Sequence, residues 1–302
     1  MAPNDQTLNF LIMPEDTLMA APAASSPVCR EFTVSELRRT GSESGLASPG
    51  GAGPDHSHWL LDLELPEGFP GEDGWTPGQF VMLRPVSWAF EPLWARPFSI
   101  CMLERGVLRI FFQVVGRGTR AMSALRRGDR VVVWGPLGRG FVVEPETPTL
   151  LLAGGIGLAP FIGYARRHPR PDQARLFFGH RPEIAEYPLD LLPKAVVVEA
   201  SRQTCAEEMA CFVGDLERWI AEYAARQGLI LACGPHPFLQ AVQSLAVKHR
   251  ARTQLSLENR MACGVGACLG CVTKTTDQAL PVKVCTQGPV FWAQDVNLGG
   301  AA

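Results

Sequence analysis

The sequence carries little charge and has no excess of either sign. Charged residues make up 19% of the 302 residues, and the formal net charge is -2. A nucleic-acid-binding domain normally shows a clear basic excess, so this class is excluded. A disordered acidic interaction protein is excluded as well, because 46% of the residues are hydrophobic and can form a folded core.

Long apolar runs are also missing. A transmembrane helix needs about 18 or more consecutive apolar residues, and the sequence contains no such run. Residues 1–20 do not start with positive charge followed by an apolar core, as a secretory signal would. We therefore expect a soluble, cytoplasmic protein whose partners include neither membrane nor nucleic acid.

Cysteine is present, but not in the pattern of a disulfide-stabilised domain. Four of the nine cysteines fall between residues 263 and 285. A small secreted scaffold is shorter and spaces its cysteines more evenly. A local group beside single cysteines indicates a metal site in a reducing compartment. The single cysteines are Cys29, Cys101, Cys205, Cys211 and Cys233.

The first half of the chain has the sequence pattern of a β domain. Residues 1–28 are rich in Ala, Pro and Ser without a clear period, which predicts a weakly ordered extension. Residues 29–146 contain short strands separated by Gly and Pro, which predicts an antiparallel barrel or sandwich. Within this part, residues 41–58 are turn-rich and are expected to form a loop between two strands.

The pattern changes after residue 146. From 147 to 250, continuous apolar strands alternate with helices, which predicts a parallel sheet covered on both faces. Residues 251–302 hold the cysteine group and are expected to form a small C-terminal domain. The predicted fold class is therefore multidomain, with an antiparallel β-barrel, an α/β domain and a small cluster-binding domain.

The cysteine group has the spacing Cys-x4-Cys-x2-Cys-x13-Cys, at Cys263, Cys268, Cys271 and Cys285. This is the order of ligands in plant-type [2Fe–2S] proteins, and the small residues between them let the loop aim its N–H groups at the sulfurs. Zinc is the competing metal, but structural zinc sites prefer two pairs of ligands rather than three plus one. The remaining alternative is four ordinary buried cysteines.

Two glycine turns indicate a nucleotide site. The first, at Gly154, Gly155 and Gly157, lies between an apolar strand and a helix, where backbone can approach a pyrophosphate. The second, residues 232–238, again ends a strand and opens a helix, so both are expected at the carboxyl edge of one sheet. A tight turn without a ligand remains the alternative for the first, and a packed core cysteine for Cys233.

Two weaker motifs occur in the β half. Arg96, in RPFS at residues 96–99, is of the type that clamps a phosphate, and Ser99 of the type that bonds a flavin ring. The sequence GRGT at residues 116–119 reads alone as a hairpin turn. In isolation, an edge-strand arginine and a turn serine explain RPFS better than a flavin site does, so the functional interpretation depends on the order of the motifs along the chain.

RPFS, GRGT, GGIGLAP and CGP occur in the order typical of the ferredoxin-NADP reductase superfamily. The tail, SLENRMACGVGACLGCVTK followed by KVCTQGPVF, resembles the electron-transfer subunits of type B dihydroorotate dehydrogenases. The resemblance spans about residues 29 to 296. It implies an FAD-binding barrel at 29–146, an NAD(P)-binding domain at 147–250 and a [2Fe–2S] domain at 251–302.

The resemblance also implies a role for individual residues. Those that would hold FAD are Arg96, Pro97, Phe98, Ser99, Phe111, Phe112, Gln113, Gly118 and Thr119. Those that would shape the nicotinamide-nucleotide site are Gly154, Gly155, Gly157, Pro160, Cys233, Gly234 and Pro235. The four clustered cysteines would ligate iron, and no general base is implied because the cofactors carry the chemistry.

The implied activity is that of an NAD(P)-linked FAD and iron–sulfur oxidoreductase subunit. Electrons would pass between NAD(H) and an FMN-containing dihydroorotate dehydrogenase catalytic subunit, by way of FAD and the [2Fe–2S] cluster, in pyrimidine biosynthesis. The implied assembly is a heterotetramer with two copies of each subunit.

One departure from the family pattern concerns the choice of nucleotide. The family usually carries an acidic stretch after the third strand of the nucleotide domain, where this chain reads EASRQTC at residues 199–205. Ser201 and Arg202 resemble the 2′-phosphate grip of plant-type NADP reductases, whereas Glu199 suits a free ribose. A solvated loop arginine is the third alternative, so the sequence favours NAD and keeps NADP open.

Two other functions are compatible with parts of the sequence. A bifurcating transhydrogenase, sulfide dehydrogenase or hydrogenase has a flavin subunit of the same architecture. The transhydrogenase subunit is expected to carry an aspartate as its first cluster ligand, so Cys263 favours the pyrimidine enzyme. A non-catalytic iron–sulfur sensor would require the ordered flavin and nucleotide motifs to be accidental.

Overall fold

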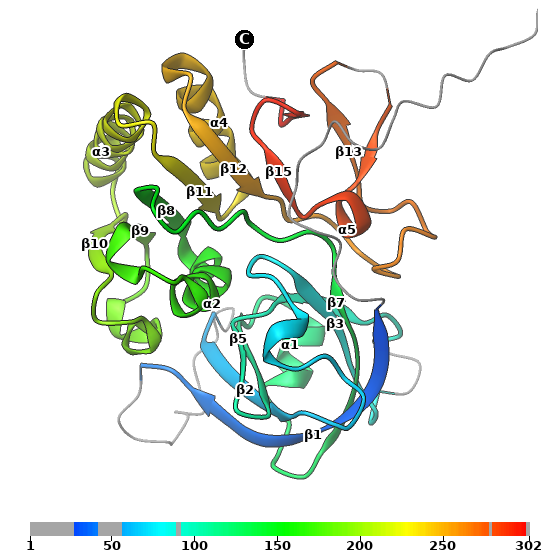
Figure 1. The fold of residues 1–302 in the computed structure, drawn as a ribbon. Coiled ribbons are helices and arrows are strands. Elements are labelled where there is room, and N and C mark those ends of the chain that lie inside the picture. Colours follow the sequence, from blue (N-terminus) through cyan, green and yellow to red (C-terminus); the bar gives the residue numbers. More distant parts are fainter. Residues whose placement is uncertain (1–26, 42–55, 89–91, 278–279, 300–302) are drawn as a thin grey trace, which may run out of the picture.

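The computed structural model describes residues 27–41, 56–88, 92–277 and 280–299. Most of the expected N-terminal extension at 1–28 and of the turn-rich segment at 41–58 lies outside these residues. The described chain forms a β-barrel, a parallel sheet with helices on both faces, and a small sheet near the C-terminus (Figure 1).

The barrel is one seven-stranded sheet in the order β4-β3-β7-β1-β2-β6-β5, and every neighbouring pair is antiparallel. One short helix, α1 (Arg117–Met122), lies between β6 and β7. The strands are β1 (Val28–Arg39), β2 (His58–Glu64), β3 (Phe80–Pro85), β4 (Arg96–Ser99), β5 (Met102–Glu104), β6 (Val107–Gln113) and β7 (Arg130–Leu137).

Alternating side chains of these strands fill the barrel. Phe32, Leu61, Leu83 and Val133 are at most 1% exposed and belong to one apolar cluster. Their neighbours along each strand point outward, as the period of two along a strand requires. The barrel therefore has its own core and presents its outer wall to the rest of the molecule.

The second sheet has the order β10-β9-β8-β11-β12-β15. Its first five strands are parallel, and β15 closes one edge as an antiparallel strand. The strands are β8 (Thr149–Gly154), β9 (Ala174–His180), β10 (Val197–Arg202), β11 (Leu229–Cys233), β12 (Arg252–Ser256) and β15 (Val290–Trp292). The helices are α2 (Ala159–Arg167), α3 (Ala206–Ala225) and α4 (His236–His249), with short 3-10 turns at Glu72–Gly74, Gly155–Leu158, Pro171–Gln173, Ile184–Glu186 and Leu189–Leu191.

Both faces of this sheet are covered, as the continuous apolar strands predict. Leu150 and Leu152 of β8 pack with α3 and α4, whereas Leu151 and Ala153 pack with α2. Helix α2 lies between the sheet and the barrel (Figure 1). The approach is close at Gly163, where a Cβ atom would lie 2.6 Å from the Trp75 ring.

The boundary expected at residue 250 divides this sheet, because β12 and β15 both come from the C-terminal segment. The sequence of β12, RTQLS, has no continuous apolar run, although Thr253 and Gln254 are buried. A buried amide needs a hydrogen-bond partner. The Gln254 side chain has one, because it accepts a hydrogen bond from Val142 N at 2.9 Å. Because its buried residues include polar ones, this strand cannot be recognised from the hydrophobicity of the sequence.

The rest of the C-terminal segment forms a three-stranded sheet, β14-β13-β16, and a short helix. These elements are β13 (Val272–Thr275), β14 (Val282–Lys283), α5 (Val284–Gln287) and β16 (Val296–Asn297). In Figure 1 this segment lies beside α4 and above the barrel. Among the helices of the described residues, none is long and apolar enough to span a bilayer.

Candidate functional site

The two predicted glycine turns meet at the centre of the parallel sheet. Strands β8 and β11 are neighbours, and the chain leaves them toward opposite edges of the sheet. Such a reversal point, at the carboxyl ends of the strands, is where open α/β sheets bind ligands. A Cβ atom on Gly157 would lie 2.1 Å from the Cys233 carbonyl oxygen, so the turns touch each other.

A cavity of about 440 Å³ opens between these turns and the barrel wall. Residues of all four predicted motifs line it, although they are spread over much of the sequence. The predicted residues on its wall are Arg96, Pro97, Phe98, Ser99, Phe111, Phe112, Gln113, Thr119, Gly157, Cys233, Gly234 and Pro235. A cavity between two domains, with a barrel on one side and a nucleotide turn on the other, suits a dinucleotide such as FAD.

The barrel side of the cavity is shaped by Arg96 and the start of α1. A Cβ atom on Gly118 would lie 2.9 Å from Arg96 Nε, so only glycine leaves this side chain in place. The Arg96 guanidinium donates to the carbonyl oxygens of Trp94, at 2.7 Å, and Ala95, at 3.2 Å. Thr119 Oγ1 accepts from Val115 N at 2.9 Å. The charge of Arg96 and the bare backbone at Gly118 fit a pyrophosphate.

The remaining predicted nucleotide residues lie off this cavity wall. Gly154 packs under the second turn, where its Cβ would lie 3.0 Å from Pro235 Cδ. Gly155 adopts a φ of +54°, which favours glycine. Pro160 is buried in the first turn of α2. Ser201 and Arg202 end β10, two strands away from β8.

The thiol of Cys233 is kept neutral by its surroundings. Burial raises the pKa of Cys233 to about 12, and a hydrogen bond with Ser256 only partly offsets this effect. A thiol with such a pKa remains protonated at neutral pH and is a poor nucleophile. Cys233 therefore shapes the cavity next to Gly234 and does not supply a reactive thiolate.

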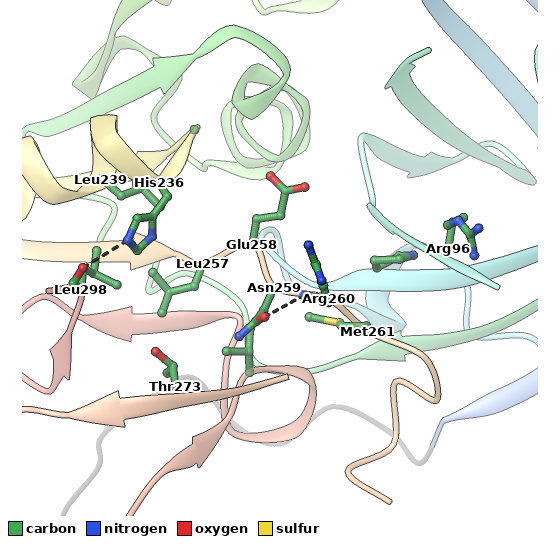
Figure 2. Close-up of a pocket in the computed structure, with 13 residues that line it drawn as sticks. Arg96, His236, Leu239, Leu257, Glu258, Asn259, Arg260, Met261, Thr273 and Leu298 are labelled. Atoms are coloured by element: carbon green, nitrogen blue, oxygen red, sulfur yellow. Dashed lines mark hydrogen bonds between the residues drawn. The ribbon is translucent and has the colours of Figure 1, made fainter. Parts of the chain in front are cut away.

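A second cavity, of about 670 Å³, continues from the first toward the C-terminal segment (Figure 2). Glu258, Asn259 and Met261 line both cavities, and the sequence reasoning assigned none of them a role. Figure 2 shows Glu258 in the space between His236 and Arg96. Only their position in the sequence could have indicated a role, because SLENRM ends two residues before the first cluster cysteine.

The four cluster cysteines lie in two pairs. The Sγ atoms of Cys263 and Cys268 are 3.4 Å apart. Cys271 and Cys285 are both 1% exposed, and Cys271 lies close enough to raise the pKa of the Cys285 thiol. Within the described residues, no three His, Cys, Asp or Glu side chains converge on a point that would suit one metal ion. Two thiol pairs instead match a [2Fe–2S] cluster, in which each iron takes two cysteines.

The electrostatics of the two pairs differ. Burial alone would raise the pKa of Cys263, but N–H groups of Val265 and Cys268 point at its sulfur, at 3.5 and 3.4 Å, and lower the pKa to about 7. Burial and the adjacent Cys271 raise the pKa of Cys285 to about 12. A metal deprotonates a coordinating thiol outright. The Cys285 thiol would therefore release a proton when iron binds, whereas the Cys263 thiol is already close to deprotonation at neutral pH.

The cluster loop is held against the barrel. Gly264 has a φ of +72°, and a Cβ there would lie 2.6 Å from Met82 Cγ. Trp134 Nε1 on β7 donates to the Cys263 carbonyl oxygen at 3.0 Å. Met261, on the cavity wall, precedes Cys263 by two residues, so their Cα atoms are at most about 7 Å apart. The cavity and the cysteines are therefore parts of one site.

Comparison with known proteins agrees with this geometry. Residues 258–297 match the family model described as the iron–sulfur cluster binding domain of dihydroorotate dehydrogenase B. The electron transfer subunit of dihydroorotate dehydrogenase B (NAD(+)) from Caldanaerobacter subterraneus is 33% identical over 223 residues, which cover 73% of this chain and 86% of that protein. The subunit of the same name from Listeria monocytogenes is 36% identical over 241 residues, covering 74% and 89%. The chain belongs to this family of electron-transfer subunits.

Solved structures show the same fold at lower identity. One, from a study of flavin-based electron bifurcation by the NADH-dependent reduced ferredoxin-NADP oxidoreductase, superposes with a TM-score of 0.68 at 20% identity, covering 88% of this chain and 90% of that one. The ferredoxin reductase in carbazole 1,9a-dioxygenase superposes with a TM-score of 0.55 at 18% identity, covering 76% and 68%. The curated relatives confirm the predicted family, and these structures confirm the fold class. This family member is an oxidoreductase subunit for flavin and iron–sulfur electron transfer.

Proposed function

We propose that this electron-transfer subunit connects a nicotinamide nucleotide with an FMN-containing dihydroorotate dehydrogenase catalytic subunit, in pyrimidine biosynthesis. The observation that carries the proposal is that two adjoining cavities extend from the second glycine turn to Met261, two residues before the first cluster cysteine. The curated relatives are named for NAD(+) and for electron transfer in the same enzyme. A complex of two copies of each subunit is the proposed assembly.

Residues of the chain have distinct tasks in this proposal. FAD, when bound, supplies the exchange between two-electron chemistry at the nucleotide and one-electron chemistry at the cluster. Arg96 and Gly118 would hold the FAD pyrophosphate against the barrel, and Gly157 would let the backbone of the turn come close to the nucleotide. Cys263 and its three partners hold the iron. Phe111 and Phe112 close the wall of the cavity against solvent, and both are at most 2% exposed.

An exposed apolar surface surrounds the cluster loop. It is formed by Leu93, Trp94, Val265 and Leu269, which are between 51% and 60% exposed. Three of them line a depression of about 470 Å³ together with Cys263. Large apolar side chains gathered on a surface typically mark a protein–protein contact. This surface, defined here as the cluster face, would bring the catalytic subunit next to the iron.

Co-expression with a dihydroorotate dehydrogenase catalytic subunit tests the proposal. We expect the two chains to co-purify, and dihydroorotate to bleach the flavin and cluster absorbance of this subunit in the complex. Reduction by dihydroorotate should require the catalytic chain. Stable association instead with a hydrogenase or glutamate-synthase-like chain, with no response to dihydroorotate, would favour another NAD(P)-linked redox complex.

The cluster face makes a prediction of its own. Trp94→Glu should weaken binding of the catalytic subunit by about 30-fold, because removal of a central aromatic contact commonly costs about 2 kcal/mol or more. The dissociation constant is measured by calorimetry or by gel filtration at limiting concentration. Val247→Glu is the matched control, since Val247 is 63% exposed on α4, away from the cluster loop. Equal binding by both variants would rule out this face.

A further inference from the structure

One loop of the nucleotide domain is in contact with the barrel. This loop, residues 181–196, follows β9, and it meets the barrel where β1 ends and β2 begins (Figure 1). Thr40 Oγ1, beside the end of β1, donates to the Glu186 carbonyl oxygen at 2.6 Å. A Cβ atom on Gly41, which has a φ of +79°, would lie 2.8 Å from Glu186 Cγ. Glu186 is therefore a point at which the two domains touch.

The Glu186 side chain binds a buried histidine of the barrel. Nδ1 of His58, the first residue of β2, lies 3.1 Å from Glu186 Oε2, and the His58 side chain is 1% exposed. A carboxylate only accepts hydrogen bonds, so His58 Nδ1 is the donor. Burial lowers the pKa of His58, and the hydrogen bond with Glu186 only partly offsets this effect. The hydrogen bond therefore fixes the orientation of the His58 ring.

The His58 ring supports the barrel wall of the cavity proposed for FAD. The rings of His58 and Phe111 are stacked, with centroids 5.6 Å apart and planes at 22°. Phe111 lines the cavity of about 440 Å³. The Tyr187 ring packs against both, with its centroid 4.9 Å from that of His58 and 6.2 Å from that of Phe111. Aromatic rings attract each other at these separations, so a movement of the loop would also move Phe111.

Tyr187 also contacts the nucleotide side of the site. Its ring lies 4.8 Å from the ring of Phe178 on β9, at an angle of 77°. Its hydroxyl lies near the first glycine turn, because a Cβ atom on Gly155 would be 4.0 Å from Tyr187 Oη. Phe111, Phe178 and Tyr187 belong to one buried apolar cluster. These rings, together with His58, therefore connect the glycine turn with the cavity wall on the barrel.

We propose that Glu186 and Tyr187 are positioning residues, which are held by Thr40 and His58 and set the distance between the glycine turn and the cavity wall at Phe111. This inference rests on the proposed function, because it concerns the same site. Both residues act through the turn and the wall rather than on the reacting atoms. Transfer between two bound groups depends steeply on their geometry, and a displacement of about 1 Å can lower a rate by about 100-fold.

Stopped-flow reduction of the FAD-loaded chain by NADH tests the proposal. We expect Glu186→Ala to lower the limiting rate of flavin reduction by about tenfold or more, because the loop no longer holds the His58 ring. Glu186→Gln should keep most of the wild-type rate, since an amide oxygen still accepts a hydrogen bond from His58 Nδ1. Thr40→Val removes the other hydrogen bond to Glu186 and should also lower the rate. Reduction by dithionite, which needs no nucleotide site, should be equal in all variants.

A spectroscopic measurement distinguishes positioning from general stability. Oxidised NAD bound to a reduced flavoprotein gives a long-wavelength charge-transfer absorbance only when the nicotinamide stacks on the flavin. We expect this absorbance to weaken in Glu186→Ala and in Thr40→Val, and to persist in Glu186→Gln. A residue that served stability alone would lower the unfolding temperature and leave this absorbance unchanged in the folded protein.

Glu104→Ala is the matched control. Glu104 of β5 also joins the two domains, because Arg166 Nε of α2 donates to Glu104 Oε1 at 2.6 Å, and its side chain is 26% exposed against 30% for Glu186. This variant should leave the reduction rate and the absorbance unchanged. If both alanine variants lower the rate equally, or if Glu186→Ala changes neither property, the positioning role is wrong. If NADH does not reduce the flavin of the wild-type chain, the proposed function itself fails.

Discussion

Cys271→Ser is expected to abolish the iron–sulfur chromophore while the flavin stays bound. Cys271 is 1% exposed and lies next to Cys285, so no other thiol can take its place without moving the loop. Soft thiolates hold iron–sulfur clusters, and a serine hydroxyl is a harder donor that gives up its proton far less readily. Iron content per chain and the electron paramagnetic resonance signal after reduction should both fall by about tenfold or more.

The control for this variant is Cys211→Ser. Cys211 is exposed on α3, within the helix that covers the far face of the parallel sheet. It should keep full iron and flavin content. Zinc in place of iron in the wild-type protein, with no visible chromophore beyond flavin, would contradict the cluster assignment. Loss of flavin together with iron in Cys271→Ser would show that the loop also holds the barrel in shape.

The sequence predicted the two large domains because their apolar patterns are simple. All six residues of β8 are buried, and a run of this kind can only belong to a sheet covered on both faces. The cluster was predicted from spacing, since the fold has to bring Cys263, Cys268 and Cys271 together within nine residues of chain. Such local constraints can be read without knowledge of tertiary structure.

Features that depend on contacts between residues far apart in the sequence could not be predicted from local patterns. β12 was missed because Gln254 and Thr253 are polar, and their burial is accompanied by hydrogen bonds from Val142 N to Gln254 and from Thr253 to the Ala251 carbonyl oxygen. The orientation of Glu199 follows from Trp219, twenty positions along the chain, so the sequence left its role open. The second cavity is formed where β4, α4, β13, α5 and residues 257–261 meet, so no single segment of the sequence carries a pattern for it.

Gly157 is the most sensitive point of the nucleotide turn. Gly157→Ala is expected to destabilise the protein by about 1–3 kcal/mol, because the new methyl would lie 2.1 Å from the Cys233 carbonyl oxygen unless the turns separate. Separation of these turns widens the floor of the site, so the affinity for a nicotinamide nucleotide should fall by about tenfold or more. Thermal unfolding of the flavin-loaded chain and titration of flavin reduction measure the two effects.

Gly214→Ala provides a control with the same chemical change. Nothing lies within 4 Å of a Cβ atom at Gly214, which is inside α3, so alanine should be neutral or stabilising by about 0.5–1 kcal/mol. The comparison distinguishes two roles for Gly157. If Gly157→Ala unfolds at a lower temperature but binds nucleotide normally, the glycine serves only the contact between β8 and β11. If both properties fall together, the close approach of the two turns is what forms the nucleotide site.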